Sequence, residues 1–233
     1  MTATLPALQT DGLGSHWTPR LEALLAAGRA AGADLVEVFL ERTDHLGLLA
    51  EQDRITSVTP AFGMGGGIRV FLGERDGFVS TNDLSEAGLR QALEQALGML
   101  GLQTNGSARS TFEGLPSLRD FGAAKADWLQ RCPALDEATL RLLEGTDQLQ
   151  HQGRHLQARR GSYARDWQEV LVAASDGTYA RDIRLHQSLG LSVIAADGEH
   201  RASLWLCSFA VQISHHAHHL DRKSTRLNSS HRT

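Results

Sequence analysis

The chain has 233 residues, a length that suits one or two globular domains. Its 41% hydrophobic and 21% charged residues are typical of a globular protein. The net charge of -4 excludes the basic surface by which proteins bind nucleic acids or anionic membranes. The sequence contains no run of about 18 apolar residues that could span a bilayer. Because Met1 to Thr10 also lacks the basic start and apolar run of a secretion signal, we predict a cytoplasmic protein.

The first part of the chain predicts one helix followed by two strands. Apolar residues recur at three and four positions from Trp17 to Ala31, which is the period of an amphipathic helix, and Gly32 is a stop signal. Gly28 falls on the apolar face of this helix, where glycine costs about 1 kcal/mol relative to alanine. The segments 34–42 and 45–58 are rich in strand-forming residues and are predicted as two strands.

The next segment predicts a hairpin and a second helix. Residues 63–73 and 78–81 read as two strands joined by a turn at Asp76-Gly77. Asp83, with Glu86 three residues later, resembles a capping box, and the apolar stripe that follows predicts a helix that ends near Gly101.

The second half of the chain predicts a helix and antiparallel strands. Residues 103–122 are rich in turn formers and read as a connection, and 133–149 predicts a third helix. Four strands are predicted at 156–164, 167–174, 179–185 and 189–195, with turns at Asp176-Gly177 and Asp197-Gly198. This order predicts an α+β, two-layer fold in which helices cover a mostly antiparallel sheet.

These patterns divide the chain into five consecutive parts. The boundaries we predict are an α+β subdomain at 1–102, a connecting loop at 103–122, a helix-plus-strand region at 123–203, a segment of doubtful reading frame at 204–220, and a tail at 221–233.

The tail differs from the rest of the chain. Residues 221–231 resemble the translation of one reading frame of a common sequencing adapter, so we interpret 221–233 as non-native. The tail holds four basic residues and one acid, which leaves the rest with 19 basic and 26 acidic residues and a net charge of -7. A basic localisation tail is the alternative.

No segment carries a recognisable active site. The glycines from Gly63 to Gly67 lack the Gly-Lys-Ser/Thr of a phosphate loop and run into a strand, which favours close backbone approach. His215 and His219 have helical metal-ligand spacing but no neighbouring carboxylate. Asp176 and Asp182 flank a predicted hairpin, which favours turn and strand-end roles. The remaining candidates, read as structural or solvated side chains, are Cys132, Cys207, His186 and His200. We therefore assign no catalytic, cofactor-binding or metal-binding residue.

Three segments together resemble the TldD/PmbA metallopeptidase family. The most specific combines a glycine-rich entry, an Ile-Arg-Val strand, a Gly-Phe exit from the turn and a Thr-Asn-Asp helix start, in the order in which the family has them. The similarity spans about Trp17 to Arg201, with 103–122 unmatched. The segments are Ala33 to Phe39, Gly65 to Leu84, and Ala174 to Arg184 followed by Ser192 to Ala195.

The resemblance implies the N-terminal portion of a zinc peptidase subunit that cuts unfolded or extended peptides. It implies an α+β domain that packs against a β-rich C-terminal domain, and a dimer with a paralogous or identical subunit. The family's His-Glu-x-x-x-His motif and cysteine ligand lie beyond this chain, so Cys207 does not correspond to that ligand. We therefore expect zinc in the full-length protein and none in this chain, which would be inactive alone. The alternative is a non-catalytic peptide-binding or regulatory subunit of the same family.

Overall fold

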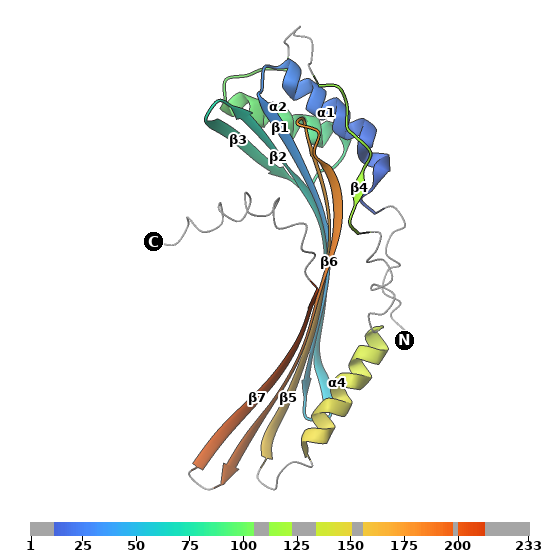
Figure 1. Ribbon diagram of the computed structural model, residues 1–233. Helices are drawn as coiled ribbons and strands as arrows, with labels where there is room; N and C mark the ends of the chain where they lie inside the picture. The colour runs from blue at the N-terminus through green and yellow to red at the C-terminus, as the bar shows by residue number, and fades with distance from the viewer. Residues whose placement is uncertain (1–11, 105–111, 123–133, 151–155, 198–199, 213–233) are drawn as a thin grey trace. The chain divides into compact units, whose positions relative to one another are not determined.

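The protein is described by a computed structural model that covers residues 12–104, 112–122, 134–150, 156–197 and 200–212 (Figure 1). The described residues form one seven-stranded sheet in the order β3-β2-β1-β5-β6-β4, and β7 also pairs with β6. The β2–β3 and β6–β7 pairs are antiparallel, and β4 is parallel to β6. The predicted α+β fold with a mostly antiparallel sheet is confirmed. Along the chain the elements are η1 Ser15–Trp17, α1 Thr18–Ala30, β1 Leu35–Glu51, β2 Arg54–Leu72, β3 Arg75–Thr81, α2 Glu86–Met99, β4 Arg119–Asp120, α4 Leu135–Gln150, β5 Leu156–Ala174, β6 Tyr179–Asp197 and β7 His200–Gln212.

The chain divides into two compact units that share the long strands. Unit 1 contains residues 1–45, 60–135 and 168–183, and unit 2 contains 46–59, 136–167 and 184–233. Strands β1, β2, β5 and β6 each contribute residues to both units.

Unit 1 has a core between its helices and its part of the sheet. Helices α1 and α2 cover one face of the strands (Figure 1). Gly28 is where α1 comes closest to β1, because a Cβ atom there would lie 2.6 Å from a methyl carbon of Val36. Gly28 weakens the helix as an isolated segment, but the close packing of α1 on β1 leaves no room for a side chain at this position.

Helix α2 begins two residues later than the capping-box pattern predicts. Ser85 is the N-cap, and its hydroxyl accepts a hydrogen bond from the amide of Gly88 at 3.1 Å. Asp83 instead accepts a hydrogen bond from the amide of Ser85 at 2.9 Å, and the hydrogen bonds with Ser85 lower the pKa of this exposed carboxyl. Both side chains order the turn that leads into the helix. The sequence pattern alone does not show which of the two is the N-cap.

The turn between β2 and β3 also differs from the prediction. Gly73, with a φ of 58°, and Glu74 connect the two strands, and Asp76 pairs with Phe71 inside the ladder. Gly77 lies in β3, where a Cβ atom would be 2.4 Å from the carbonyl oxygen of Ala96 in α2. The Asp-Gly pair therefore marks a close helix-strand contact, whereas Asp176-Gly177 forms the predicted turn, with a φ of 90° at Gly177.

Unit 2 packs one described helix on its strands. Helix α4 buries Ala138, Leu142 and Thr146. Gly161 of β5 allows this contact, because a Cβ atom there would lie 2.7 Å from Leu142 and 2.8 Å from Thr146.

The strands are longer than the sequence predicts. Residues 34–42 and 45–58 were expected as two separate strands, but β1 continues to Glu51, and the chain reverses at Gln52 and Asp53 before β2. The strands predicted on either side of residues 165 and 187 are likewise joined into β5 and β6. Strands of 17 to 19 residues are far longer than the usual five or six, so short polar interruptions were misread as ends. None of the described helices is long and apolar enough to cross a lipid bilayer.

Candidate functional site

A buried ion cluster on the sheet of unit 1 is the most distinctive group of charged side chains that the structure describes. Glu169 of β5 is fully buried, at 0% exposure. Its Oε1 atom accepts hydrogen bonds from Nε and an Nη of Arg181, at 2.8 and 2.5 Å. Its Oε2 atom lies 3.5 Å from Nε of Arg42, which is also buried. One carboxylate thus joins strands β1, β5 and β6.

Arg181 extends the cluster to the short strand β4. Its Nη1 atom donates to both carboxylate oxygens of Asp120, at 3.0 and 2.9 Å. Burial alone would lower the pKa of Arg181, but the hydrogen bonds and charges of Glu169 and Asp120 raise it above its ordinary value. The guanidinium therefore stays charged, and its two carboxylates are compensated by it.

This cluster is unsuited to zinc binding. Glu169 faces two guanidinium groups, whose positive charges would repel a divalent cation. Among the residues that the structure describes, no group of three or more His, Cys, Asp or Glu side chains could hold a metal ion. We interpret the cluster as a tie between strands.

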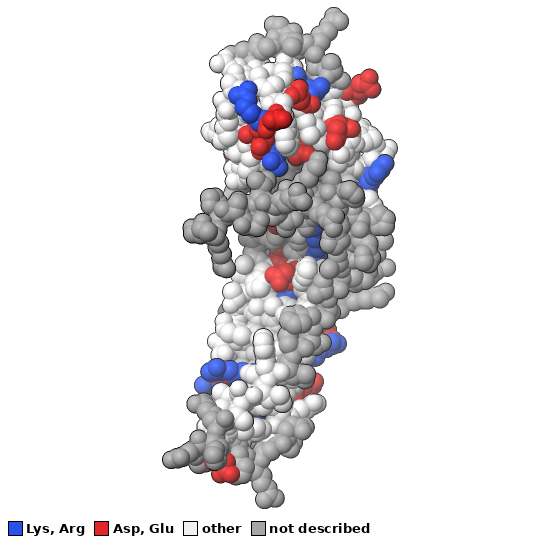
Figure 2. Space-filling model, turned by 60° about the vertical axis from the view of Figure 1, so that its left-hand side comes forward, with Lys and Arg blue, Asp and Glu red and all other residues white. Residues whose placement is uncertain are grey.

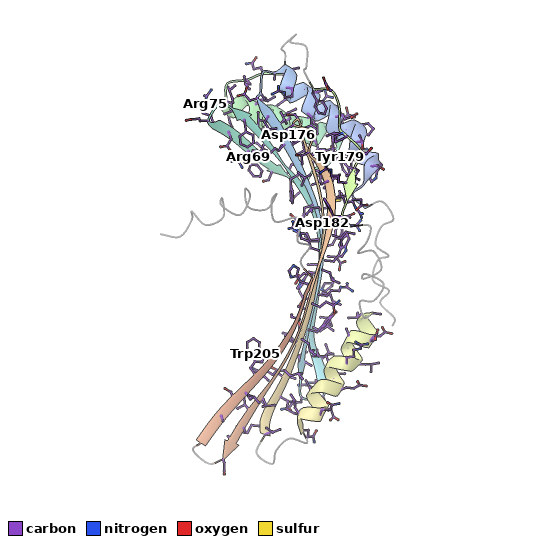
Figure 3. All side chains as sticks on the ribbon, viewed as in Figure 1. Arg69, Arg75, Asp176, Tyr179, Asp182 and Trp205 are labelled. Carbon is purple, nitrogen blue, oxygen red and sulfur yellow. The ribbon has the colours of Figure 1, made fainter. Side chains whose placement is uncertain are left out.

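The glycine-rich segment from Gly63 to Gly67 lies within strand β2 and not at a helix N-terminus, as predicted from the strand that follows it in the sequence. A Cβ atom on Gly67 would lie 2.7 Å from the ring of Phe78 on β3, and one on Gly66 would lie 2.8 Å from Leu40 on β1. These glycines allow close approach of neighbouring side chains. Arg69 lies two residues after Gly67, on the same face of the strand, and its guanidinium lies 4.8 Å from the centre of the Phe71 ring (Figure 3).

Asp176 and Asp182, two candidates from the sequence, have different structural roles. Asp176 accepts a hydrogen bond from the amide of Thr178 at 2.9 Å and so orders the β5–β6 turn. Asp182, the fourth residue of β6, is 5% exposed, and its Oδ1 accepts a hydrogen bond from the amide of Ile183. Between them, the hydroxyl of Tyr179 lies 2.7 Å from that of Thr18, and burial raises the pKa of Tyr179 (Figure 3).

The remaining candidates do not form a site within the described part of the chain. His186 is exposed on β6. Cys207 and His200 lie in β7. The pair His215 and His219 and the cysteine Cys132 lie outside the described residues.

The ion cluster was missed by the sequence analysis, although a signal was present. Arg42 occupies the inward phase of β1, because buried residues alternate along this strand. Glu169 lies in a similarly buried stretch of β5, before Val170 and Leu171. Charged residues at inward positions of two predicted strands indicate a buried pair.

Charge is mixed on the face of the molecule that Figure 2 shows. On this face, acidic and basic side chains lie beside one another and form no continuous basic patch.

Comparison with protein families gives two adjacent matches. Residues 36–100 match the family model described as PmbA/TldA metallopeptidase domain 1, and residues 129–218 match the PmbA/TldA metallopeptidase central domain. The second match includes residues 204–218. A search of curated proteins finds no match.

Solved structures of low sequence identity share the fold. TldE from Thermococcus kodakarensis has a TM-score of 0.66 at 16% identity, over 89% of this chain and 46% of that one. A candidate modulator of DNA gyrase from Bacteroides thetaiotaomicron has a TM-score of 0.64 at 15% identity, over 86% of this chain and 46% of that one. A similarly described protein from Thermotoga maritima has a TM-score of 0.63 at 14% identity, over 83% and 43%. The chain therefore spans less than half the length of the structures it matches.

Proposed function

Because this chain belongs to the TldD/PmbA metallopeptidase family, we propose that it is the N-terminal portion of a zinc metallopeptidase subunit that acts on unfolded or extended peptides. The observation that carries the proposal is the pair of family matches, to the first and the central metallopeptidase domains in that order. The shared fold of the three solved structures supports the family assignment and says nothing of the substrate.

We propose that the zinc ligands lie in the part of the full-length protein that follows this portion. The acidic side chains gathered in unit 1 do not fit the metal, because arginines already compensate Glu169 and Asp120. When bound in a peptidase, zinc polarises the scissile carbonyl and lowers the pKa of a bound water. No described residue of this chain is given a part in that step, so we propose that the chain alone is inactive.

The contribution proposed for this chain is to hold peptide rather than to cut it. Strand β3 ends the sheet order in unit 1 and offers its outer backbone groups to an extended peptide. The ring of Phe78, 54% exposed on this strand, provides apolar surface for a peptide side chain. The strand has only seven residues, and Arg75 and Asp76 at its start are charged, which suits a transient contact.

A partner subunit of the same family, either paralogous or identical, completes the proposal. The second candidate function is a non-catalytic peptide-binding or regulatory subunit. It differs from the peptidase only in the metal ligands of the half of the molecule that this chain does not include. An intact His-Glu pair there supports the peptidase, and its loss supports the regulatory subunit.

The experiment is to express the full-length protein, alone and with a family partner, and to measure its zinc content and its cleavage of an unfolded peptide. We expect stoichiometric zinc, cleavage that stops on adding a chelator and returns with zinc, and no cleavage by residues 1–220 alone. Zinc-free protein without activity, which still binds the peptide, would support the regulatory subunit instead.

A further inference from the structure

Residues 112–122 form a strap that lies on unit 1 although they belong to neither family match. The first match ends at residue 100 and the second begins at residue 129, so the strap falls in the stretch between them. In Figure 1 the segment passes along α1 and reaches β4 beside β6. Its regular structure is limited to β4, whose two residues pair with Ala180 and Arg181 of β6. Because so little backbone pairing holds the strap, its position depends on a few side-chain contacts.

The first anchor of the strap is a carboxylate on α1. Oε1 of Glu22 accepts a hydrogen bond from the amide of Leu115 at 2.9 Å. The chain turns at Gly114 to present this amide, with a φ of 108° that favours glycine. The side chains of Phe112, Leu115 and Leu118 pack against the core of unit 1, and all three are only partly buried. The apolar contact of the strap is therefore small.

The second anchor is the pair between Asp120 and Arg181 of the ion cluster. Both carboxylate oxygens of Asp120 accept from Nη1 of Arg181, at 3.0 and 2.9 Å. The amide of Phe121 donates to the carbonyl oxygen of Arg181 at 2.9 Å, and the amide of Gly122 donates to Oδ1 of Asp120 at 2.9 Å. A Cβ atom on Gly122 would lie 2.8 Å from Ile183, so the strap touches β6 here. The carboxylate of Asp120 thus joins the strap to β6 and orders the turn that follows.

Asp120 also completes the charge balance of the ion cluster. Arg42 and Arg181 bring two positive charges, and Glu169 supplies one negative charge from the sheet. Asp120 supplies the second negative charge, from the strap. Its side chain is 33% exposed, whereas that of Glu169 is 1% exposed, so salt reaches the Asp120 pair much more easily. The pair at the strap can therefore open while Glu169 keeps both of its arginine partners.

We propose that the strap is a conformational latch, which is closed when Asp120 pairs with Arg181 and which detaches when that pair is broken, while the sheet and helices of unit 1 stay folded. Local opening is easiest where few buried contacts hold a segment, and the strap meets that condition. Detachment would free the connection between the first and the central family domains from unit 1. The latch therefore determines whether that connection is fixed.

The latch goes beyond the proposed function and needs neither zinc, a peptide nor a partner subunit. The competing account is a strap held by its apolar side chains, with Asp120 in a partly exposed ion pair that contributes little. The two accounts differ in what happens when only the charge of Asp120 is removed. They also differ in the response to salt, which screens an ion pair and leaves apolar contacts in place.

The test measures amide hydrogen exchange by mass spectrometry on the full-length protein, in peptides that cover the strap. Asp120→Asn removes the charge and keeps an oxygen that can accept a hydrogen bond. Asp76→Asn is the matched control, because Asp76 of β3 pairs with Arg69 at 2.9 Å and contacts no part of the strap. The exposure of that pair, 38% and 21%, is close to the 33% and 18% of Asp120 and Arg181. Far-UV circular dichroism confirms that each variant is folded.

We expect Asp120→Asn to speed exchange in the strap roughly 10-fold or more, as the loss of a hydrogen bond to a charged group does, with α1, α2 and the strands unchanged. Asp76→Asn should leave exchange in the strap unchanged. Raising the salt concentration from about 0.05 to 0.5 M should speed exchange in the strap of the wild type more than in Asp120→Asn.

Two sets of results would overturn the latch. Equal strap exchange in the wild type and Asp120→Asn, or a wild-type strap that does not respond to salt, would show that the apolar side chains hold the segment. Faster exchange throughout unit 1 in Asp120→Asn would show that the strap does not open alone.

Discussion

The two compact units cover their strands to different extents. In unit 1, η1 and two helices pack on the sheet, and the contiguous core that joins them includes Leu25, Val38, Leu93 and Leu171. In unit 2 one described helix buries three of its residues. Large apolar side chains stay exposed in both units, so the units differ in the size of the buried core and not in exposed apolar surface. The exposed side chains are Leu49, Val58, Leu140, Leu189, Leu204 and Trp205 in unit 2 and Phe39, Phe62, Phe78, Met99 and Phe121 in unit 1. The larger core indicates that unit 1 supplies most of the stability.

The strongest test of unit 1 is to remove the centre of its ion cluster. Glu169→Ala leaves the Arg42 and Arg181 guanidinium groups without the buried carboxylate, and removing one partner of a buried ion pair costs about 3–5 kcal/mol. Urea denaturation measures the loss. Glu51→Ala breaks an exposed pair with Arg160 in unit 2 and should cost less than about 1 kcal/mol. Equal losses would show that the cluster contributes no more than a surface pair.

A second test removes the main helix-sheet contact of unit 2. Leu142 is 0% exposed and packs on Gly161, so Leu142→Ala should cost about 2–4 kcal/mol. Amide exchange should become faster in α4 while α1 and α2 keep their protection. The control is Leu140→Ala, a residue of the same helix that is 61% exposed and should cost about 0.5 kcal/mol or less. Uniform loss of protection across both units would mean that they unfold together.

A third test asks whether close packing outweighs helix propensity in unit 1. Gly28→Ala adds a methyl group 2.6 Å from Val36, which should destabilise the protein by about 1–3 kcal/mol. Gly98→Ala in α2 meets nothing within 4 Å and should stabilise it by about 0.5–1 kcal/mol. Thermal denaturation of both variants measures the opposite signs. Stabilisation by Gly28→Ala would contradict the tight contact between α1 and β1.

The smallest expected effect comes from the buried tyrosine of unit 1. Tyr179→Phe loses the hydrogen bond with Thr18 and should cost about 1 kcal/mol at neutral pH. Burial raises the folded-state pKa of Tyr179, so above its unfolded value of about 10 the unfolded state releases the proton more readily and wild-type stability falls. The difference between wild type and variant should therefore shrink as the pH rises through 10. A difference that stays constant or grows would contradict a buried, neutral hydroxyl.

The sequence predicted the fold class and the helices better than the strand ends and the ion cluster. Helix positions follow from the period of apolar residues, and α1 and α4 begin and end within two residues of the predicted bounds. Strand ends failed because local breaks such as Thr43 and Asp44 do not end β1, whose buried residues resume at Leu46. Asp76-Gly77 failed as a turn because the sequence does not show that Ala96 of α2 packs on Gly77.

The ion cluster could not be assembled from sequence because its members are far apart along the chain. Arg42, Asp120, Glu169 and Arg181 meet through the sheet order and the β4–β6 pairing, which single-sequence patterns do not give. The division at residues 102 and 122, and the adapter-like nature of residues 221–233, stay predictions. The resemblance to the TldD/PmbA family was confirmed because its specific segment, from Gly65 to Leu84, is an ordered strand, turn and strand that the first family domain matches.

The most direct test of the proposed peptidase is to read the source DNA through the codon for Leu220 and onward, from a primer placed well upstream. We predict that the reading frame continues into a second half that contains a His-Glu-x-x-x-His segment and a later cysteine. A natural stop near Leu220, or a continuation without those ligands, would contradict the zinc peptidase and leave a peptide-binding or regulatory subunit.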